Sequence, residues 1–240
     1  MEGFLGSILI QALVNVIQFP IMIFWFPQLF EMKVFSKLSD DEESSDEKSS
    51  DEKELPLLIL DLNKVLAFRN FIYDDKMILD EDDRETATVL GNHYGWRRPH
   101  LEYFLEYVFD HFEVAVWSSA NSKNVDLMCD LIFAERKDEL LFVWDQTYCE
   151  KIKPHPNPNE SKPFLFRKDL VRVWNTFREY DETNTIVLDD CPYKMTDNPA
   201  LNVIFPKPWS YLKEESSADT YLRFEAIVEL EHRRVFLENQ

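Results

Sequence analysis

Between residues 56 and 212, short unbroken runs of apolar side chains alternate with stretches in which apolar residues return every three or four positions. The unbroken runs predict strands covered on both faces, as in a parallel sheet, and the periodic stretches predict amphipathic helices. The predicted strands are 57–60, 114–117, 185–188 and, more weakly, 141–144, and the predicted helices cover 99–112, 125–132 and 170–177. This alternation predicts an α/β domain, with helices flanking a parallel sheet.

The first 38 residues follow a different pattern, because no charged side chain occurs from residue 3 to residue 30. That length exceeds the roughly 20 residues with which a helix crosses a bilayer. Polar residues recur within it at helical spacing, at Ser7, Gln11, Asn15 and Gln18. Such a stripe fits either a helix in the membrane interface or a span beside a partner helix. A core helix of a soluble protein is the alternative. We expect residues 1–38 to associate with a membrane, and Lys33 and Lys37 favour a following domain in the cytosol or nucleus.

Residues 39–55 are expected to form a disordered linker. From residue 39 to residue 54 the chain holds nine acidic residues, two lysines and five serines, with no aromatic or aliphatic side chain. Such a segment buries no apolar surface and its like charges repel one another. The serines are either kinase targets or part of a plain spacer, and the spacer is the simpler interpretation.

The overall charge narrows the class of partner. A formal net charge of −19 speaks against nucleic acid, whose phosphates attract basic surfaces. With only four glycines, a glycine-rich nucleotide loop is not expected either. The three cysteines have neither zinc-site nor disulfide spacing and are expected to be reduced thiols.

Polar side chains directly follow three of the predicted strands. Asp61 follows the first, Ser118 the second, and Asp189 and Asp190 the third. Ligands bind beyond the carboxyl ends of strands in open α/β sheets, so one pocket is expected to receive all four. Clustered carboxylates repel one another unless a cation lies between them, and oxygen ligands without histidine favour Mg²⁺. Taken singly, Asp61 is better explained as a cap or turn residue than as a catalytic one. The ordered set instead indicates phosphoryl transfer.

The same positions resemble the motifs of the haloacid dehalogenase superfamily. More narrowly, they resemble its RNA polymerase II C-terminal-domain phosphatase-like branch, also called the NLI-interacting-factor-like domain. The matching segments are Asp61-Leu62-Asn63-Lys64-Val65-Leu66, Trp117-Ser118-Ser119-Ala120, Lys168-Asp169-Leu170, Val187-Leu188-Asp189-Asp190-Cys191-Pro192, Asn198-Pro199 and Asn202-Val203-Ile204-Phe205-Pro206. The resemblance implies a Rossmann-like haloacid dehalogenase fold with a small insertion after the first strand. The segment from Phe68 to Tyr94 would carry that insertion and does not itself reveal a substrate.

The resemblance also implies a role for each matching residue. Asp61 would be the nucleophile, forming an aspartyl phosphate. Ser118 and Lys168 would bind the phosphate of a phosphorylated protein or peptide. The ligands of Mg²⁺ would be Asp61, Asp189, Asp190 and the main-chain carbonyl of Asn63.

Asn63 departs from the family pattern, which has an aspartate there as general acid and base. An amide cannot carry that proton, and losing such a group typically costs about 10²–10⁴-fold in rate. The expected function is a Mg²⁺-dependent phosphoserine or phosphothreonine protein phosphatase with slow turnover. The alternative is a catalytically inactive phosphatase-like protein that binds a partner or acts as a scaffold at a membrane, as some relatives with this fold do.

The expected organisation therefore has four parts. They are a membrane-associated segment (1–38), an acidic linker (39–55), a phosphatase-like domain (56–212) and a C-terminal helix (213–240).

Overall fold

The computed structural model describes residues 55–73, 79–153, 164–211, 218–237 and 239. All of them belong to one unit, residues 53–240. The predicted membrane-associated segment 1–38 and the linker 39–55, except for its last residue, lie outside the described residues. Within the described ranges, no helix is both long enough and apolar enough to cross a bilayer.

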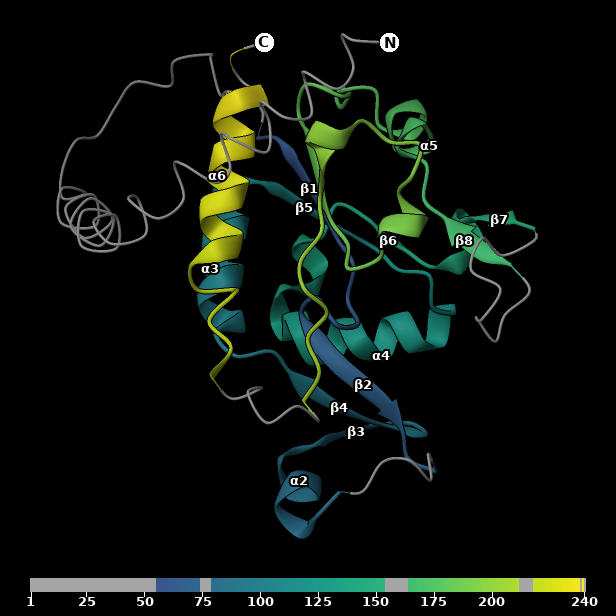
Figure 1. Cartoon of the computed structure of the whole chain (residues 1–240), viewed down its shortest axis with the longest axis vertical. Coiled ribbons are helices and arrows are strands. Elements are labelled where there is room, and N and C mark those ends of the chain that lie inside the picture. Colours follow the sequence, from purple (N-terminus) through teal and green to yellow (C-terminus); the bar gives the residue numbers. More distant parts are fainter. Residues whose placement is uncertain (1–54, 74–78, 154–163, 212–217, 238, 240) are drawn as a thin grey trace, which may run out of the picture. The chain divides into compact units, whose positions relative to one another are not determined.

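A five-stranded parallel sheet with the order β10-β9-β1-β5-β6 forms the centre of this unit (Figure 1). Its strands are β1 (Leu57–Leu60), β5 (Glu113–Trp117), β6 (Val143–Trp144), β9 (Thr185–Leu188) and β10 (Val203–Ile204). Both β1 and β9 are buried along their whole length. Because both faces of each strand are covered, their residues do not alternate with charged ones. The weaker run at 141–144 yields a strand of only two residues.

Helices cover both faces of the sheet. They are α3 (Leu101–His111), α4 (Ser122–Phe133), α5 (Leu170–Thr176) and α6 (Glu225–Leu237). On one face, Leu170 and Val173 of α5 join a core cluster with Leu57 and Ile59 of β1. Successive strand residues point to opposite faces of a sheet, so the remaining residues of β1 face away from α5. A second layer of helices covers that opposite face. The predicted parallel sheet flanked by helices is therefore confirmed.

In that other layer, α3 contacts β5 and α6 contacts β9. Helices α3 and α6 lie side by side (Figure 1), and the hydroxyl of Tyr107 donates a 2.8 Å hydrogen bond to the carboxylate of Glu231. The start of α3 differs from the prediction. His100 takes a left-handed conformation with φ of 64°, so helical conformation begins only at Leu101 and Pro99 precedes the helix.

The predicted insertion lies between β1 and α3. It contains a three-stranded antiparallel sheet, order β2-β4-β3, and a short helix. These elements are β2 (Ala67–Phe71), α2 (Glu81–Thr86), β3 (Thr88–Leu90) and β4 (His93–Arg97). The insertion packs on α4 at Gly95, where a Cβ atom would lie 2.5 Å from the Leu90 side chain and 3.0 Å from that of Leu131. A larger residue at this position of β4 would force the Leu90 side chain to shift, and glycine avoids that.

The remaining elements are short. A two-stranded antiparallel ribbon pairs β7 (Glu150–Ile152) with β8 (Leu165–Arg167). The 3₁₀ helices are η1 (Ala134–Glu139), η2 (Gln146–Tyr148), η3 (Pro192–Lys194) and η4 (Ala200–Asn202). Of these, β8 and η3 matter most for the site, because each leads into a lysine described below.

Candidate active site

Three aspartates meet at the carboxyl edge of the parallel sheet. Asp61 follows β1, and Asp189 and Asp190 follow its neighbour β9. The two strands remain in register up to this point, because the Asp61 N–H donates to the carbonyl of Leu188 at 2.9 Å. One oxygen of each carboxylate lies within 4.8 Å of an oxygen of the other two. These three side chains, called the acidic cluster below, lie up to 129 residues apart in the sequence and meet in the structure.

Lys168 enters this acidic cluster directly after β8. Its Nζ lies 3.5 Å from Oδ1 of Asp61 and donates a hydrogen bond to Oδ2 of Asp189. The Lys168 side chain is fully buried. A buried lysine head group is tolerated only when it is paired, and Asp61 and Asp189 supply the partners here.

A second lysine, Lys194, also reaches the acidic cluster, and sequence reasoning missed it. Its Nζ lies 3.0 Å from Asp61 Oδ2, 3.3 Å from Asp189 Oδ1 and 3.8 Å from Asp190 Oδ1. Lys194 is the last residue of η3, the turn that follows β9 and the two aspartates. The signal in the sequence was its spacing of four residues from Asp190, because a tight turn after a strand brings such a residue back to the strand end.

These contacts set the charge state of the site. Burial alone would raise the pKa of Asp61, but Lys168 and Lys194 outweigh it and lower the pKa to about 2. Burial raises the pKa of Asp190 to about 6, with a smaller upward contribution from the other two aspartates and an opposing one from Lys194. Burial would lower the pKa of Lys194, but the three carboxylates raise it well above its usual range. At neutral pH, Asp61 is therefore an ionised carboxylate held between two ammonium groups.

Ser118 stands at the same edge, on the other side of Asp61. It follows β5, which pairs with β1, and it is buried. Its backbone N–H donates to the carbonyl of Trp144 at 2.9 Å, and its Oγ accepts from the N–H of Ala120 at 3.4 Å. The hydroxyl thus belongs to a tight turn that begins where β5 ends.

Asn63 lies two residues after Asp61, in the turn between β1 and β2. Its side-chain oxygen accepts a 2.9 Å hydrogen bond from the backbone N–H of Arg69. The next residue, Lys64, has a left-handed φ of 68°, and its N–H donates to the carbonyl of Ala67. The amide therefore ties the loop after β1 to the first strand of the insertion. A carboxylate at this position could accept the same hydrogen bond.

The acidic cluster fits a hard divalent cation. Three carboxylates offer oxygen ligands close together, which is the donor set that Mg²⁺ prefers. Oδ1 of Asp61 is buried and accepts no hydrogen bond from the described residues, so it retains an unused ligand position. The ammonium of Lys194 meets part of the same need for positive charge.

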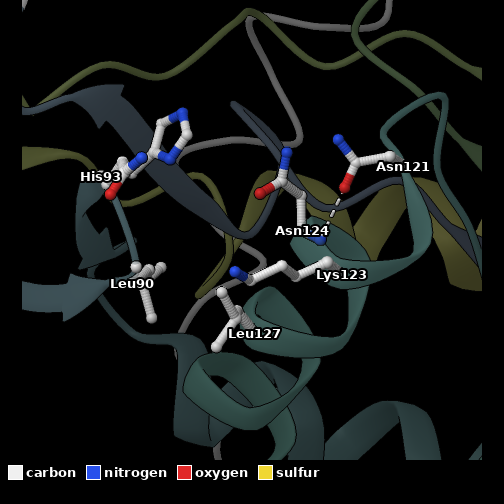
Figure 2. A pocket seen from close by; sticks show the side chains of 8 residues that line it. Leu90, His93, Asn121, Lys123, Asn124 and Leu127 are labelled. Atoms are coloured by element: carbon white, nitrogen blue, oxygen red, sulfur yellow. Dashed lines mark hydrogen bonds between the residues drawn. The ribbon is translucent and has the colours of Figure 1, made fainter.

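A hollow lies between the turn joining β3 to β4 and the first turns of α4. Figure 2 shows Lys123, Asn124 and Leu127 of α4 facing Leu90 and His93 of the insertion. Its lining contains amide, imidazole and ammonium groups and no carboxylate. None of its lining residues belongs to the acidic cluster.

The fold and the acidic cluster together define an α/β domain with three carboxylates gathered at the edge of a parallel sheet. Residues 56–234 match the family model described as NLI interacting factor-like phosphatase, so the chain belongs to this phosphatase family. The family resemblance seen in the sequence motifs is confirmed. The match continues past residue 212, where the domain was predicted to end, and includes most of α6.

Similar proteins carry related names. A CTD phosphatase-like protein of Invertebrate iridescent virus 3 is 28% identical over 181 residues, covering 69% of this chain and 90% of the viral protein. An FCP1 homology domain-containing protein of Schizosaccharomyces pombe is 28% identical over 152 residues, covering 60% of this chain and 57% of that protein.

Among solved structures, that of Fcp1, an essential RNA polymerase II CTD phosphatase, is 19% identical with a TM-score of 0.47. The match covers 78% of this chain and 51% of Fcp1, so this chain spans about half the length of that protein. An identity this low says nothing about activity.

Proposed function

We propose that this chain is a Mg²⁺-dependent phosphatase that removes phosphate from phosphoserine or phosphothreonine in proteins, with Asp61 as the nucleophile. The observation that carries the proposal is the state of Asp61. Its carboxylate is buried at the carboxyl edge of the sheet, and two lysines hold its pKa at about 2. An ionised carboxylate in this position is ready to attack phosphorus without first losing a proton.

The proposed reaction has two halves. An Asp61 oxygen bonds to phosphorus while the bond from phosphorus to the serine oxygen breaks, and the departing alkoxide takes up a proton from water. Water then attacks the aspartyl phosphate, which releases inorganic phosphate and restores the carboxylate. Ser118 would hold a phosphate oxygen, and the charge of Lys168 would offset that of the phosphoryl group.

Magnesium would be held by the acidic cluster and by the main-chain carbonyl of Asn63, where it would neutralise charge on the phosphoryl oxygens. Asp61, Asp189 and Asp190 supply the carboxylate oxygens. Both aspartates after β9 are positioned by the sheet, and the N–H of Cys191 donates to Asp189 Oδ1 at 2.9 Å. The backbone therefore orients at least one of the carboxylates independently of any ion.

Asn63 makes the proposed turnover slow. Both halves of the reaction move a proton, and an amide can neither give one to the alkoxide nor take one from water. The same residue favours the second candidate function, a phosphatase-like protein that binds a phosphorylated partner without turnover. In that case Asn63 serves mainly through its hydrogen bond to Arg69.

The proposed substrate is a phosphorylated protein or peptide near a membrane. Membership of a phosphatase family supports a phosphorylated substrate. The uncharged run from residue 3 to residue 30 supports a membrane attachment that would leave the phosphatase domain in the cytosol or nucleus. The acidic residues 39–54 would then act as a spacer between the two.

The deciding experiment is hydrolysis of an aryl phosphate by the full chain, with Mg²⁺ and with a chelator, in wild type and in Asp61→Asn. We expect slow hydrolysis that depends on Mg²⁺ and is lost in Asp61→Asn. Equal hydrolysis by both proteins would overturn the proposal, since Asp61 would not be the nucleophile. If neither protein hydrolyses the ester but wild type binds a phosphoserine peptide, the binding function is the correct one.

A further inference from the structure

Lys194 lies in the acidic cluster in the position of a cation shared by three carboxylates. Its Nζ contacts Asp61, Asp189 and Asp190 at 3.0, 3.3 and 3.8 Å. We propose that the Lys194 ammonium is a built-in counter-ion that competes with the divalent cation, so that metal binds only when this side chain leaves. The inference deepens the proposed function, because it concerns how the same site is loaded.

Two cations that share the same carboxylates repel each other, and this repulsion sets Lys194 against the metal. A magnesium ion binds its oxygen ligands at about 2.0–2.1 Å. If it shared Oδ2 of Asp61 with Lys194, whose Nζ is 3.0 Å away, the two cations would lie no more than about 5 Å apart. Like charges at that separation inside a domain repel strongly, because the surrounding protein screens them poorly. The three carboxylates already receive one positive charge from Lys168, so Lys194 brings the cluster close to neutrality before any metal arrives.

The backbone shows which of the two lysines can leave. The carbonyl of Lys194 accepts a 2.8 Å hydrogen bond from the N–H of Lys168, and its own N–H donates to the carbonyl of Cys191 at 3.0 Å. These bonds hold the main chain of Lys194, so a departure from the cluster would involve its side chain alone. That side chain is 15% exposed, whereas the side chain of Lys168 is fully buried. Lys194 therefore has a route to solvent, and Lys168 is the permanent partner of the acidic cluster.

The test is Mg²⁺ binding to the full chain, measured by isothermal titration calorimetry in wild type, Lys194→Met and Lys64→Met. Methionine keeps most of the length of the lysine side chain and removes its charge. Lys64 is an exposed lysine whose charge acts on Asp190, so Lys64→Met controls for a change in net charge near the acidic cluster. If the ammonium occupies the cluster at least nine-tenths of the time, Lys194→Met should bind Mg²⁺ about 10-fold more tightly or better. Lys64→Met should change the affinity by less than about 3-fold, because an exposed charge is screened by solvent.

Thermal unfolding supplies a second readout. Without metal, Lys194→Met should melt below wild type, because three carboxylates then share only Lys168. Saturating Mg²⁺ should remove that deficit and raise its melting temperature more than that of wild type. If Lys194→Met does not fold, Lys194→Gln, which keeps a hydrogen-bond donor, gives the same comparison.

Magnesium affinity in Lys194→Met equal to or weaker than that of wild type would overturn the competition, and so would the absence of Mg²⁺ binding in both. Neither result touches the proposed function, which is judged separately by hydrolysis that depends on Asp61 in wild type. Conversely, tighter Mg²⁺ binding in Lys194→Met together with no such hydrolysis would keep the counter-ion role and remove the phosphatase activity.

Discussion

Arg98 and Asp219 form a two-pronged ion pair across 121 residues of sequence, with Nε–Oδ1 and Nη2–Oδ2 distances that are both 2.9 Å. The third nitrogen of the guanidinium donates to the carbonyl of Val65 at 3.0 Å, and the group lies 4.6 Å from the ring centre of Tyr221. Arg98 is buried. The pair therefore ties the loop after β1, which includes Asn63, to the segment that leads into α6.

Breaking this pair should destabilise the domain. Asp219→Asn leaves a buried guanidinium with neutral partners only, and we expect it to lower the free energy of unfolding by about 2–3 kcal/mol, somewhat below a fully buried pair because Asp219 is partly exposed. Urea unfolding of the full chain measures the change. The matched control is Glu139→Gln, which weakens the equally two-pronged but exposed pair with Arg136 and should cost much less, because solvent screens an exposed pair. Equal losses in the two variants would show that burial of Arg98 is not what matters.

Magnesium should raise the melting temperature of the full chain, because a ligand that binds only the folded state stabilises it by mass action. Asp190→Ala should abolish the shift, since it removes one of the three clustered carboxylates. Differential scanning fluorimetry with and without Mg²⁺ gives the measurement, with Asp126→Ala as a control at an exposed acid on α4. A full shift in Asp190→Ala would remove Asp190 from the metal site.

Asn63→Asp should speed turnover by roughly 10-fold or more, because it supplies the missing proton carrier. The new carboxylate can still accept the hydrogen bond from Arg69, so the loop after β1 should hold its shape. In wild type, aryl phosphate should react faster than a phosphoserine peptide, since a phenolate leaves more easily than an alkoxide. Phosphorylated Asp61 should accumulate, because its hydrolysis needs a base.

Steady-state kinetics on both substrates and mass spectrometry of the trapped protein test this expectation. Asn63→Ala is the control, as it removes the hydrogen bond without adding a carboxylate, and it should not gain activity. Rapid turnover of phosphoserine by wild type would mean that another group carries the proton. If wild type and Asn63→Asp are both inactive, the result favours the binding function.

A fusion of residues 1–38 to a soluble reporter should sediment with membranes, because its uncharged run is longer than a bilayer span. Alkaline carbonate extraction then separates a spanning helix, which stays in the pellet, from an interfacial helix, which is released. The reporter alone is the control. Recovery of the fusion in the soluble fraction would identify the segment as a core helix and would change the predicted division of the chain.

The sequence by itself determined the central strands of the sheet and the sheet edge at which the acidic residues lie. Burial on both faces demands unbroken apolar strands, so the runs at 57–60 and 185–188 correspond to β1 and β9 residue for residue. Parallel pairing then brings Asp61, Asp189 and Asp190 to one edge of the sheet. Because parallel strands end at the same edge, the residues that directly follow β1 and β9 lie close together there. The start of α3 was misplaced because a left-handed residue such as His100 leaves no mark in an apolar pattern.

Only the tertiary structure decided which charged side chains meet inside the domain. Lys194 enters the acidic cluster because η3 folds back on the backbone of Lys168, and Arg98 finds Asp219 through the packing of elements far apart in sequence. Apolar periodicity reports which face of an element is buried, but it carries no information about the partner of a lysine or arginine. The partners of Arg98 and Lys168 depend on how separate elements pack and on where a long flexible side chain can find opposite charge, and neither is local in the sequence.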